Sequence, residues 1–297
     1  MALEAVDVET WSNLIFQGVL LGILYSLIAM GYNLVYRANK SINFAVPQVV
    51  LLAAYTALIT ATATGRLEVA LASAIIVSVA VSMAIERGVA RPLLGRPPIA
   101  LIGATLGVFY ALKGVVLVVG GSEVAVLPLD IDYYRLGALT VATNDLISLL
   151  GAIPVLAGVV LLHRKTSFGA AMRAVAEDAE GAAAYGLPVR RLMLAGWALA
   201  GLVGGLGSIL LAVKTQVSPD LEYYAIRALA ASLIAGLDSL GGVLLGGIVL
   251  GLAEQLASKF LDPYLPGIGS DIAFLLLLLI LFVKPYGFFG SERIERV

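Results

Sequence analysis

Long apolar segments recur along the whole chain and are separated by short polar connections. Runs of about 18 or more apolar residues are typical of transmembrane helices, because the hydrocarbon core of a bilayer is about 30 Å thick. The pattern predicts an all-α integral membrane protein, a polytopic bundle of about 8–10 transmembrane helices, some of them interrupted. The candidate spans are residues 12–36, 42–63, 67–90, 98–119, 144–163, 190–213, 224–237, 240–258 and 270–284.

Two segments interrupt this pattern. The second span opens with INFAVPQ at residues 42–48, where a plain helix start with Pro47 in the first turn is the alternative interpretation. The seventh span is too short to cross about 30 Å at about 1.5 Å per residue. It runs into AGLDSLGG at residues 235–242. Interrupted hydrophobic segments in corresponding places of two halves indicate a transport pathway near the membrane middle.

We therefore expect residues 42–48 and 236–242 to break their helices and to face one shared solute path. Exposed backbone at membrane depth is tolerated only where it lines a cavity or is buried in protein. A neutral lining suits a zwitterion or an uncharged amide, which must pass without being trapped. The candidate path residues are Asn43, Phe44, Pro47, Gln48, Gly236, Asp238 and Ser239.

Lysine and arginine are concentrated in alternate connections. Residues 37–40, 87–96, 164–191 and 284–296 hold most of them, and the other connections hold only Arg66, Arg135, Lys214, Arg227 and Lys259. Cytoplasmic loops carry the excess of positive charge, so we predict an external N-terminus and a cytoplasmic C-terminus. The acidic start of the chain, with Glu4, Asp7 and Glu9, differs from the basic start of a signal peptide. The first span is expected to act as its own insertion signal.

Composition narrows the chemistry further. The chain is 60% hydrophobic and 13% charged, whereas soluble domains carry about a quarter charged residues. A net charge of −1 and the lack of a basic tract argue against nucleic-acid binding. There is no cysteine, and the one histidine, His163, stands beside Arg164 and Lys165, where we expect a solvated interfacial residue. No phosphate-binding G-x-x-x-x-G-K-[ST] loop is present, so no nucleotide, cofactor or metal is expected on this chain.

Polar residues inside the spans are further candidates. Lys113 is close enough to the outer end of its span for its ammonium to reach the interface. Glu254 is expected either to hydrogen-bond between helices or to contact solute, and the amide of Asn33 is expected to bridge helices. Glycines four residues apart predict close helix packing in a compact bundle, and the pairs are Gly18/Gly22, Gly103/Gly107, Gly201/Gly205, Gly242/Gly246 and Gly247/Gly251.

The longest connection on the predicted cytoplasmic side is residues 164–190, with the sequence TSFGAAMRAVAEDAEGAAAYGLPV at 166–189. It predicts a short alanine-rich helix that stops at Gly186 and is followed by Pro188. Such a helix is only marginally stable alone in water, so docking in the groove of another protein would order it. The alternative is a simple surface helix that links two spans.

Four segments together resemble one known family. The loop TSFGAAMRAVAEDAEGAAAYGL is similar to the segment that couples permeases of bacterial ABC importers to their ATPases. YSLIAMGYNLVYRANKSINFA at 25–45, RALAASLIAGLDSLGGVLLGGIVLGLAEQL at 227–256 and DIAFLLLLLILFVKPYGFFG at 271–290 resemble signatures of the branched-chain (hydrophobic) amino-acid permease family. The match is colinear and covers nearly the whole chain.

This resemblance implies a single permease domain over residues 1–297 in the cytoplasmic membrane of a prokaryote. It implies a second permease subunit, identical or related, two cytoplasmic ATPase subunits and an extracytoplasmic solute-binding protein. The chain itself would hydrolyse no ATP. The residues that would contact the ATPases are Arg173, Ala176, Glu177, Asp178, Ala182, Ala183 and Gly186.

The chain departs from the family pattern at both interrupted segments. The family typically follows INFA with His-Gly-Glu or a similar polar set, but this chain has Val46, Pro47 and Gln48. Its Gly-Gly-x-Gly-Ser is replaced by AGLDS at 235–239, with Gly241 where proline is usual. These changes leave the solute open, since relatives also handle urea, amides and aromatic acids.

Two other classes of protein compete with this interpretation. An ion- or proton-coupled secondary transporter would need buried acids or a proton relay, and the predicted spans contain few carboxylates. An intramembrane enzyme would need a nucleophile with a base or a metal set. With no cysteine and one histidine at a span end, the sequence argues against the enzyme.

Overall fold

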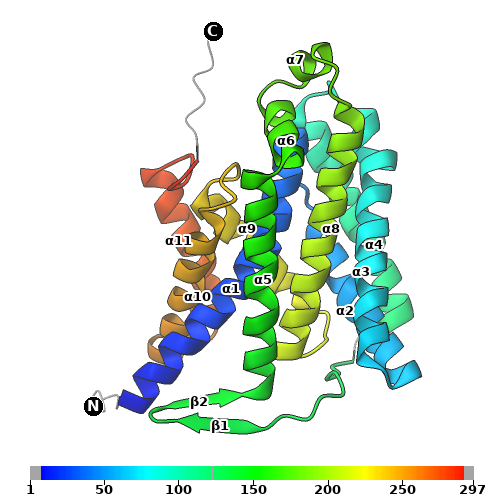
Figure 1. The fold of residues 1–297 in the computed structure, drawn as a ribbon. Coiled ribbons are helices and arrows are strands. Elements are labelled where there is room, and N and C mark those ends of the chain that lie inside the picture. The colour runs from blue at the N-terminus through cyan, green and yellow to red at the C-terminus, as the bar shows by residue number, and fades with distance from the viewer. Residues whose placement is uncertain (1–7, 122, 291–297) are drawn as a thin grey trace.

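The computed structural model describes residues 8–121 and 123–290 (Figure 1). Glu4, Asp7, Arg293 and Arg296, which entered the predicted topology, lie outside the described residues. Each of the nine predicted spans corresponds to a helix, and these helices are α1 (Val8–Asn39), α2 (Val46–Thr64), α3 (Leu67–Ile85), α4 (Pro98–Gly120), α5 (Thr143–Lys165), α8 (Val189–Lys214), α9 (Leu221–Ala235), α10 (Val243–Phe260) and α11 (Ile268–Val283).

Seven of the helices in the described part of the chain are long and apolar enough to cross a membrane. The two shorter ones are α9 with 15 residues and α11 with 16 residues. The prediction of an all-α polytopic membrane protein is confirmed. After α3 the chain continues as a π-helical turn, Glu86–Ala90, and a 3₁₀ turn, Arg91–Leu93, before α4 begins.

The two ends of the bundle differ in what they carry. The start of α1 and a hairpin of β1 (Tyr133–Leu136) and β2 (Leu139–Ala142) lie at one end, whereas α6 (Ser167–Glu177), α7 (Ala179–Ala184) and the C-terminal segment lie at the other (Figure 1). The strands pair antiparallel, with Tyr133 opposite Ala142. Arg135 joins the hairpin to α1 through an ion pair of 2.8 Å with Glu9.

Helix α1 forms the centre of the bundle. It is buried without a break from Leu20 to Val35, on every side, and packs against α8, α9 and α10. A helix that is apolar all round belongs in such a core position. Serine and glycine bring the neighbours close: a Cβ atom on Gly22 would lie 2.5 Å from the Cα atom of Ile248 in α10.

Four of the five glycine pairs pack as predicted. Gly18 and Gly22 face Gly247 and Gly251, and a Cβ atom on Gly251 would lie 2.4 Å from the Gly18 carbonyl oxygen. Gly201 and Gly205 in α8 face α3. Gly242 and Gly246, at the start of α10, face α9 and the C-terminal segment. Gly103 and Gly107 differ, because a Cβ atom on either meets none of the described residues within 4 Å.

The predicted cytoplasmic helix is divided in two. Asp178 lies between α6 and α7 with an extended backbone, and its Oδ1 accepts hydrogen bonds from the N–H groups of Glu180 and Gly181 at 3.1 and 3.0 Å. An aspartate in this role ends one helix and starts the next. The predicted stop is confirmed: Gly186 has φ +83°, and Leu187 N–H donates to the Ala182 carbonyl at 3.1 Å.

Candidate functional site

The break before α2 lies inside the bundle. Asn43 Oδ1 accepts a hydrogen bond of 2.9 Å from Ala45 N–H, and Phe44 N–H donates to Thr105 Oγ1 at 3.2 Å. Thr105 is seven residues into α4, or about 10 Å from its start at about 1.5 Å per residue. Pro47 stands in the first turn of α2, where its missing N–H is harmless. The segment is therefore a regular helix start that lies beside the middle part of α4.

Gln48 belongs to a polar cluster between three helices. Its Nε2 donates to Glu222 Oε2 at 2.5 Å, and Lys113 Nζ donates to Glu222 Oε1 at 2.6 Å. Gln48 and Glu222 are buried, while the Lys113 side chain is 34% exposed. The pairing of the Lys113 ammonium with a carboxylate was not expected from the sequence.

Glu222 was not identified from the sequence. The seventh span was predicted to begin at residue 224, which left Glu222 in a connecting loop. Helix α9 in fact begins at Leu221, so the carboxylate lies in its first turn, where the helix dipole favours an anion. The hydrophobic pattern alone does not show where a short helix begins within the bundle. The usable signal for Glu222 is an acid at the start of an apolar helix that also contains an arginine.

The second interrupted segment is held by α1. Asn33 Nδ2 donates to the carbonyl oxygens of Gly236 and Ser239, both at 3.1 Å. Arg37, in the last turn of α1, donates to the Asp238 carbonyl oxygen at 2.9 Å through Nε. The segment therefore lies beside the end of α1 and not at the middle of the bundle.

The two candidate path segments are separated along α9. Gln48 contacts the first turn of α9 and Gly236 is its C-terminal cap, so about 21 Å of helix lies between them. The structure does not bring the amides of residues 43–48 together with Asp238 and Ser239 at one depth. The two segments border different parts of the molecule.

The C-terminal segment completes the end of α9. The N–H groups of Phe288 and Phe289 donate to the carbonyls of Ile234 and Ala235, both at 2.9 Å. Carbonyls in the last turn of a helix have no partner within the helix, so this docking satisfies them. Gly287 has φ +77° and a Cβ atom there would lie 2.5 Å from the Leu233 carbonyl oxygen, so only glycine fits.

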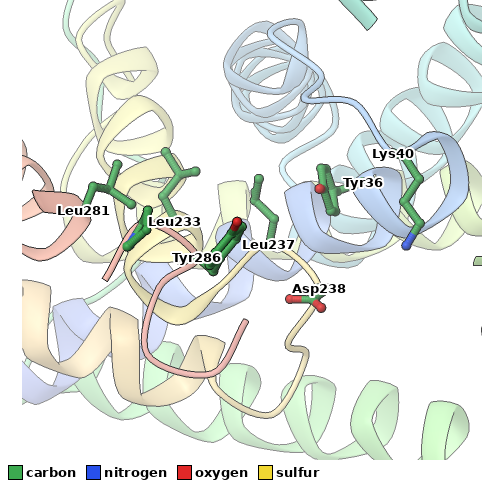
Figure 2. Close-up of a pocket in the computed structure, with 8 residues that line it drawn as sticks. Tyr36, Lys40, Leu233, Leu237, Asp238, Leu281 and Tyr286 are labelled. Carbon is green, nitrogen blue, oxygen red and sulfur yellow. The ribbon is translucent and has the colours of Figure 1, made fainter. Parts of the chain in front are cut away.

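Asp238 borders a cavity of about 180 Å³ at this end of the bundle (Figure 2). Figure 2 shows Tyr36 and Lys40 from the end of α1 on one side and Tyr286 from the C-terminal segment on the other. The lining also contains Leu233, Leu237, Leu281 and Pro285.

A second cavity at the same end is strongly cationic. Asp238 and Ser239 border it together with Arg37, His163, Arg164 and Arg173, and its volume is about 340 Å³. His163 is buried, and neither ring nitrogen has a hydrogen-bond partner among the described residues. The prediction of a solvated histidine is wrong, because α6 folds back over the end of α5 and Arg173 donates to the His163 carbonyl.

Glu254 serves helix packing in this structure. It accepts hydrogen bonds from Tyr25 Oη at 2.6 Å and from Arg227 Nη1 at 2.9 Å, and all three side chains are largely buried between α1, α9 and α10. Arg227 was counted among the loop cations but lies inside α9. Without Arg227, the connections predicted to be external hold four cations. The excess of lysine and arginine in the connections predicted to be cytoplasmic is therefore larger than expected.

The predicted ATPase-contact residues divide into two groups. Ala176 and Ala182 are buried against the bundle, so they position α6 and α7. Glu177, Asp178, Ala183 and Gly186 are exposed, and Arg173 is half-buried through its bond to the end of α5. Tyr185, which is 93% exposed at the tip of the loop, was missed because the prediction followed alanines and charges.

Comparison with known proteins places this architecture in a family. Residues 14–283 match the family model described as branched-chain amino acid transport system / permease component. The chain is 28% identical over 299 residues to the high-affinity branched-chain amino acid transport system permease protein LivH of Escherichia coli K12, covering 95% of this chain and 96% of that protein. It is 27% identical to the corresponding permease BraD of Pseudomonas aeruginosa, covering 94% and 96%.

A solved structure shares the fold. PsaBC from Streptococcus pneumoniae, solved in complex with a Fab, aligns with a TM-score of 0.51 at 13% identity and covers 91% of each chain. At this identity the likeness concerns the fold alone. The family match, which spans all nine helices except the first turns of α1, agrees with the resemblance found in the sequence motifs. The chain belongs to the branched-chain amino acid permease family, the membrane subunits of ABC importers.

Proposed function

We propose that the chain is one of two permease subunits in an ATP-driven importer for branched-chain amino acids or a closely related zwitterion. The observation that carries this proposal is the family match over residues 14–283, together with relatives that are named as branched-chain amino acid permeases over their whole length. The second subunit is identical or related to this one. The chain supplies the path and binds no nucleotide of its own.

The end with α6 and α7 is the cytoplasmic end in this proposal, and two ATPase subunits dock there. The charge asymmetry of the connections supports this orientation. Beside α7 lies an open groove of about 640 Å³ whose lining is mostly apolar but contains two arginines. It is lined by Leu94, Gly95, Ala179, Glu180, Ala183, Leu187, Pro188, Val189, Arg190, Arg191 and Met193. A groove of this kind fits a partner with an apolar ridge and acidic flanks.

The opposite end receives the solute-binding protein. The β1–β2 hairpin presents Tyr133 and Leu136, which are 74% and 64% exposed, on an element that an ion pair joins to α1. Tyrosine combines an apolar body with a polar tip and is enriched where proteins meet. The hairpin therefore offers a docking surface far from the ATPases.

The test is solute uptake by the reconstituted transporter. The chain is purified with its second subunit, the ATPases and the binding protein, and labelled L-leucine is supplied outside proteoliposomes. Leucine is expected to accumulate only with ATP at the ATPase side, while the chain alone hydrolyses no ATP. Accumulation driven by a proton or sodium gradient without ATP would establish the secondary transporter instead and overturn the proposal.

A further inference from the structure

An ion pair joins the apolar helix α4 to the first turn of α9. Lys113 is 15 residues from the start of α4 and 7 residues from its end, so about 22 Å and 10 Å of helix flank it. Glu222 accepts its hydrogen bond at 2.6 Å. Charged groups at this depth are costly and are retained for function, and as a pair these two add no net charge to the path.

The side-chain amide of Gln48 has one hydrogen-bond acceptor that no group in this cluster fills. A carboxylate only accepts hydrogen bonds, so the amide must turn its N–H₂ group toward Glu222. The amide oxygen Oε1 is then a fully buried acceptor with no partner among the described residues. Buried polar atoms are nearly always hydrogen-bonded, so this atom calls for a donor that the chain does not supply. A free acceptor beside a carboxylate is the environment that an ammonium group fits, since it carries three donors.

The other side of the cluster opens on the surface of the subunit. The Lys113 side chain is 34% exposed, and Tyr110 and Tyr223, whose hydroxyls lie within electrostatic range of it, are 70% and 51% exposed. An ammonium group facing lipid at this depth would be unfavourable. This face of the subunit therefore borders protein or a water-filled path in the assembled transporter.

The exposed face of α4, about a quarter turn from Lys113, carries a strip of small residues. Gly103, Gly107 and Gly114 are exposed, and Cβ atoms on them would meet none of the described residues within 4 Å. Small residues at such spacing allow a second helix to approach closely in a membrane. The strip fits the second permease subunit, and Lys113 lies on the neighbouring flank of α4.

We propose that Gln48, Lys113 and Glu222 form the binding site for an amino-acid zwitterion on its way through the membrane. The solute ammonium is held by the Glu222 carboxylate and Gln48 Oε1, and the solute carboxylate is held by Lys113. This inference rests on the proposed function and adds the residues that recognise the solute.

The site works by exchange of ion pairs. The Glu222 side chain is 5% exposed, so the pair is closed in this structure. When the solute enters, Lys113 exchanges the protein carboxylate for that of the solute, and Glu222 exchanges the protein ammonium for that of the solute. No charge is left unpaired at any stage, which avoids the large penalty of an isolated buried ion. A solute with only one of the two charges would leave Lys113 or Glu222 unpaired and is rejected.

Uptake of labelled L-leucine by the complete transporter tests this. Glu222→Gln and Lys113→Met are each expected to lower uptake by about 10- to 100-fold, the range expected for loss of a hydrogen bond to a charged group. Exchange of the two charges, Lys113→Glu with Glu222→Lys, restores a pair but reverses its polarity beside Gln48, so uptake stays low. Full recovery in that double variant would show a purely structural ion pair. Glu68→Gln, in an exposed pair with Arg66, is the matched control and keeps normal uptake.

A second measurement uses no charge variant, so it remains valid even where the Lys113 and Glu222 variants do not fold. The chain has no cysteine, so a Tyr223→Cys thiol is the single thiol of this subunit and can be followed in the band of this chain from the complete transporter. A small cationic methanethiosulfonate reagent should modify it, and L-leucine should slow the modification several-fold. Leu278→Cys, in the apolar exposed row of α11, is the control and should not react. A Tyr223→Cys thiol that does not react, or one that leucine does not protect, overturns the inference.

The two proposals fail differently. If the natural transporter accumulates no leucine with ATP, the proposed function fails. If it accumulates leucine and the Glu222→Gln and Lys113→Met forms do so equally well, only the binding site is wrong.

Discussion

Asn33 uses its whole side-chain amide in the buried contact between α1 and α9. Its N–H₂ group donates to the carbonyl oxygens of Gly236 and Ser239, and its oxygen accepts a hydrogen bond from the Ser232 hydroxyl. The amide thereby satisfies backbone that becomes exposed where α9 stops inside the bundle. In the membrane interior water cannot take over this role.

Replacement of Asn33 by alanine is expected to lower stability. The Ser239 carbonyl and the Ser232 hydroxyl would lose the bond to Asn33, and the Gly236 carbonyl would keep only the bond from Ser239 N–H, at a cost of about 1–3 kcal/mol in the free energy of unfolding. Thermal unfolding of the detergent-purified chain measures this as a lower midpoint. The control is Thr62→Val, which removes an exposed hydroxyl bonded only to its own helix. Equal midpoints for Asn33→Ala and the natural chain would contradict the assigned role.

Residue-level chemistry was only partly predictable from the sequence. The break at residues 42–48 and the polar nature of Gln48 followed from the interrupted apolar pattern. Its partners did not, because Lys113 and Glu222 are 109 residues apart and meet only when α4 and α9 pack. His163 was placed in solvent for the same reason, since nothing local shows that α6 covers the end of α5.

At the scale of whole helices, close contacts at glycine residues hold neighbouring helices together. Helices α1 and α10 approach through Gly18, Gly22, Gly247 and Gly251, so that backbone touches backbone. Without a hydrophobic driving force between helices in lipid, such close packing is a main source of association. The pair Gly103 and Gly107 has the same spacing but no neighbour in the described chain, which marks α4 as a helix with a free face.

Gly22→Ala and Gly107→Ala separate these two situations. A methyl group on Gly22 would lie 2.5 Å from the Ile248 Cα atom and 2.6 Å from the Gly247 carbonyl oxygen, so the helices must move apart. We expect a loss of about 1–3 kcal/mol, as for other overpacked cores. Gly107→Ala is expected to leave the folded monomer unchanged. Thermal unfolding of both variants decides, and a stable Gly22→Ala protein would contradict the observed contact.

Elements were predicted better than their ends. All nine spans were located, because apolar runs, Pro47 and Gly186 are local signals that the fold retains. The predicted single helix between the fifth and sixth spans is two, since the capping bonds of Asp178 compete with helix continuation. The hairpin at 133–142 and the docking of residues 287–289 on α9 depend on long-range hydrogen bonds that no local pattern shows.

At the scale of the whole molecule, the two ends of the bundle carry different elements. The hairpin and the start of α1 lie at one end, and α6, α7 and the C-terminal segment lie at the other (Figure 1). The polar cluster at Glu222 lies between them, and the cavities at Asp238 lie toward the end with α6. We propose that ATPases act on the α6–α7 end while solute enters from the hairpin end.

A single cysteine at Ala183 tests that claim most directly. Ala183 is exposed on α7 and borders the apolar groove, whereas its neighbour Ala182 is buried. We predict that Ala183→Cys forms a disulfide with a cysteine in the surface of a co-expressed ATPase that docks on this groove, and that an impermeant maleimide added outside intact cells leaves it unmodified. Labelling of Ala183→Cys from outside would invert the topology and contradict the account.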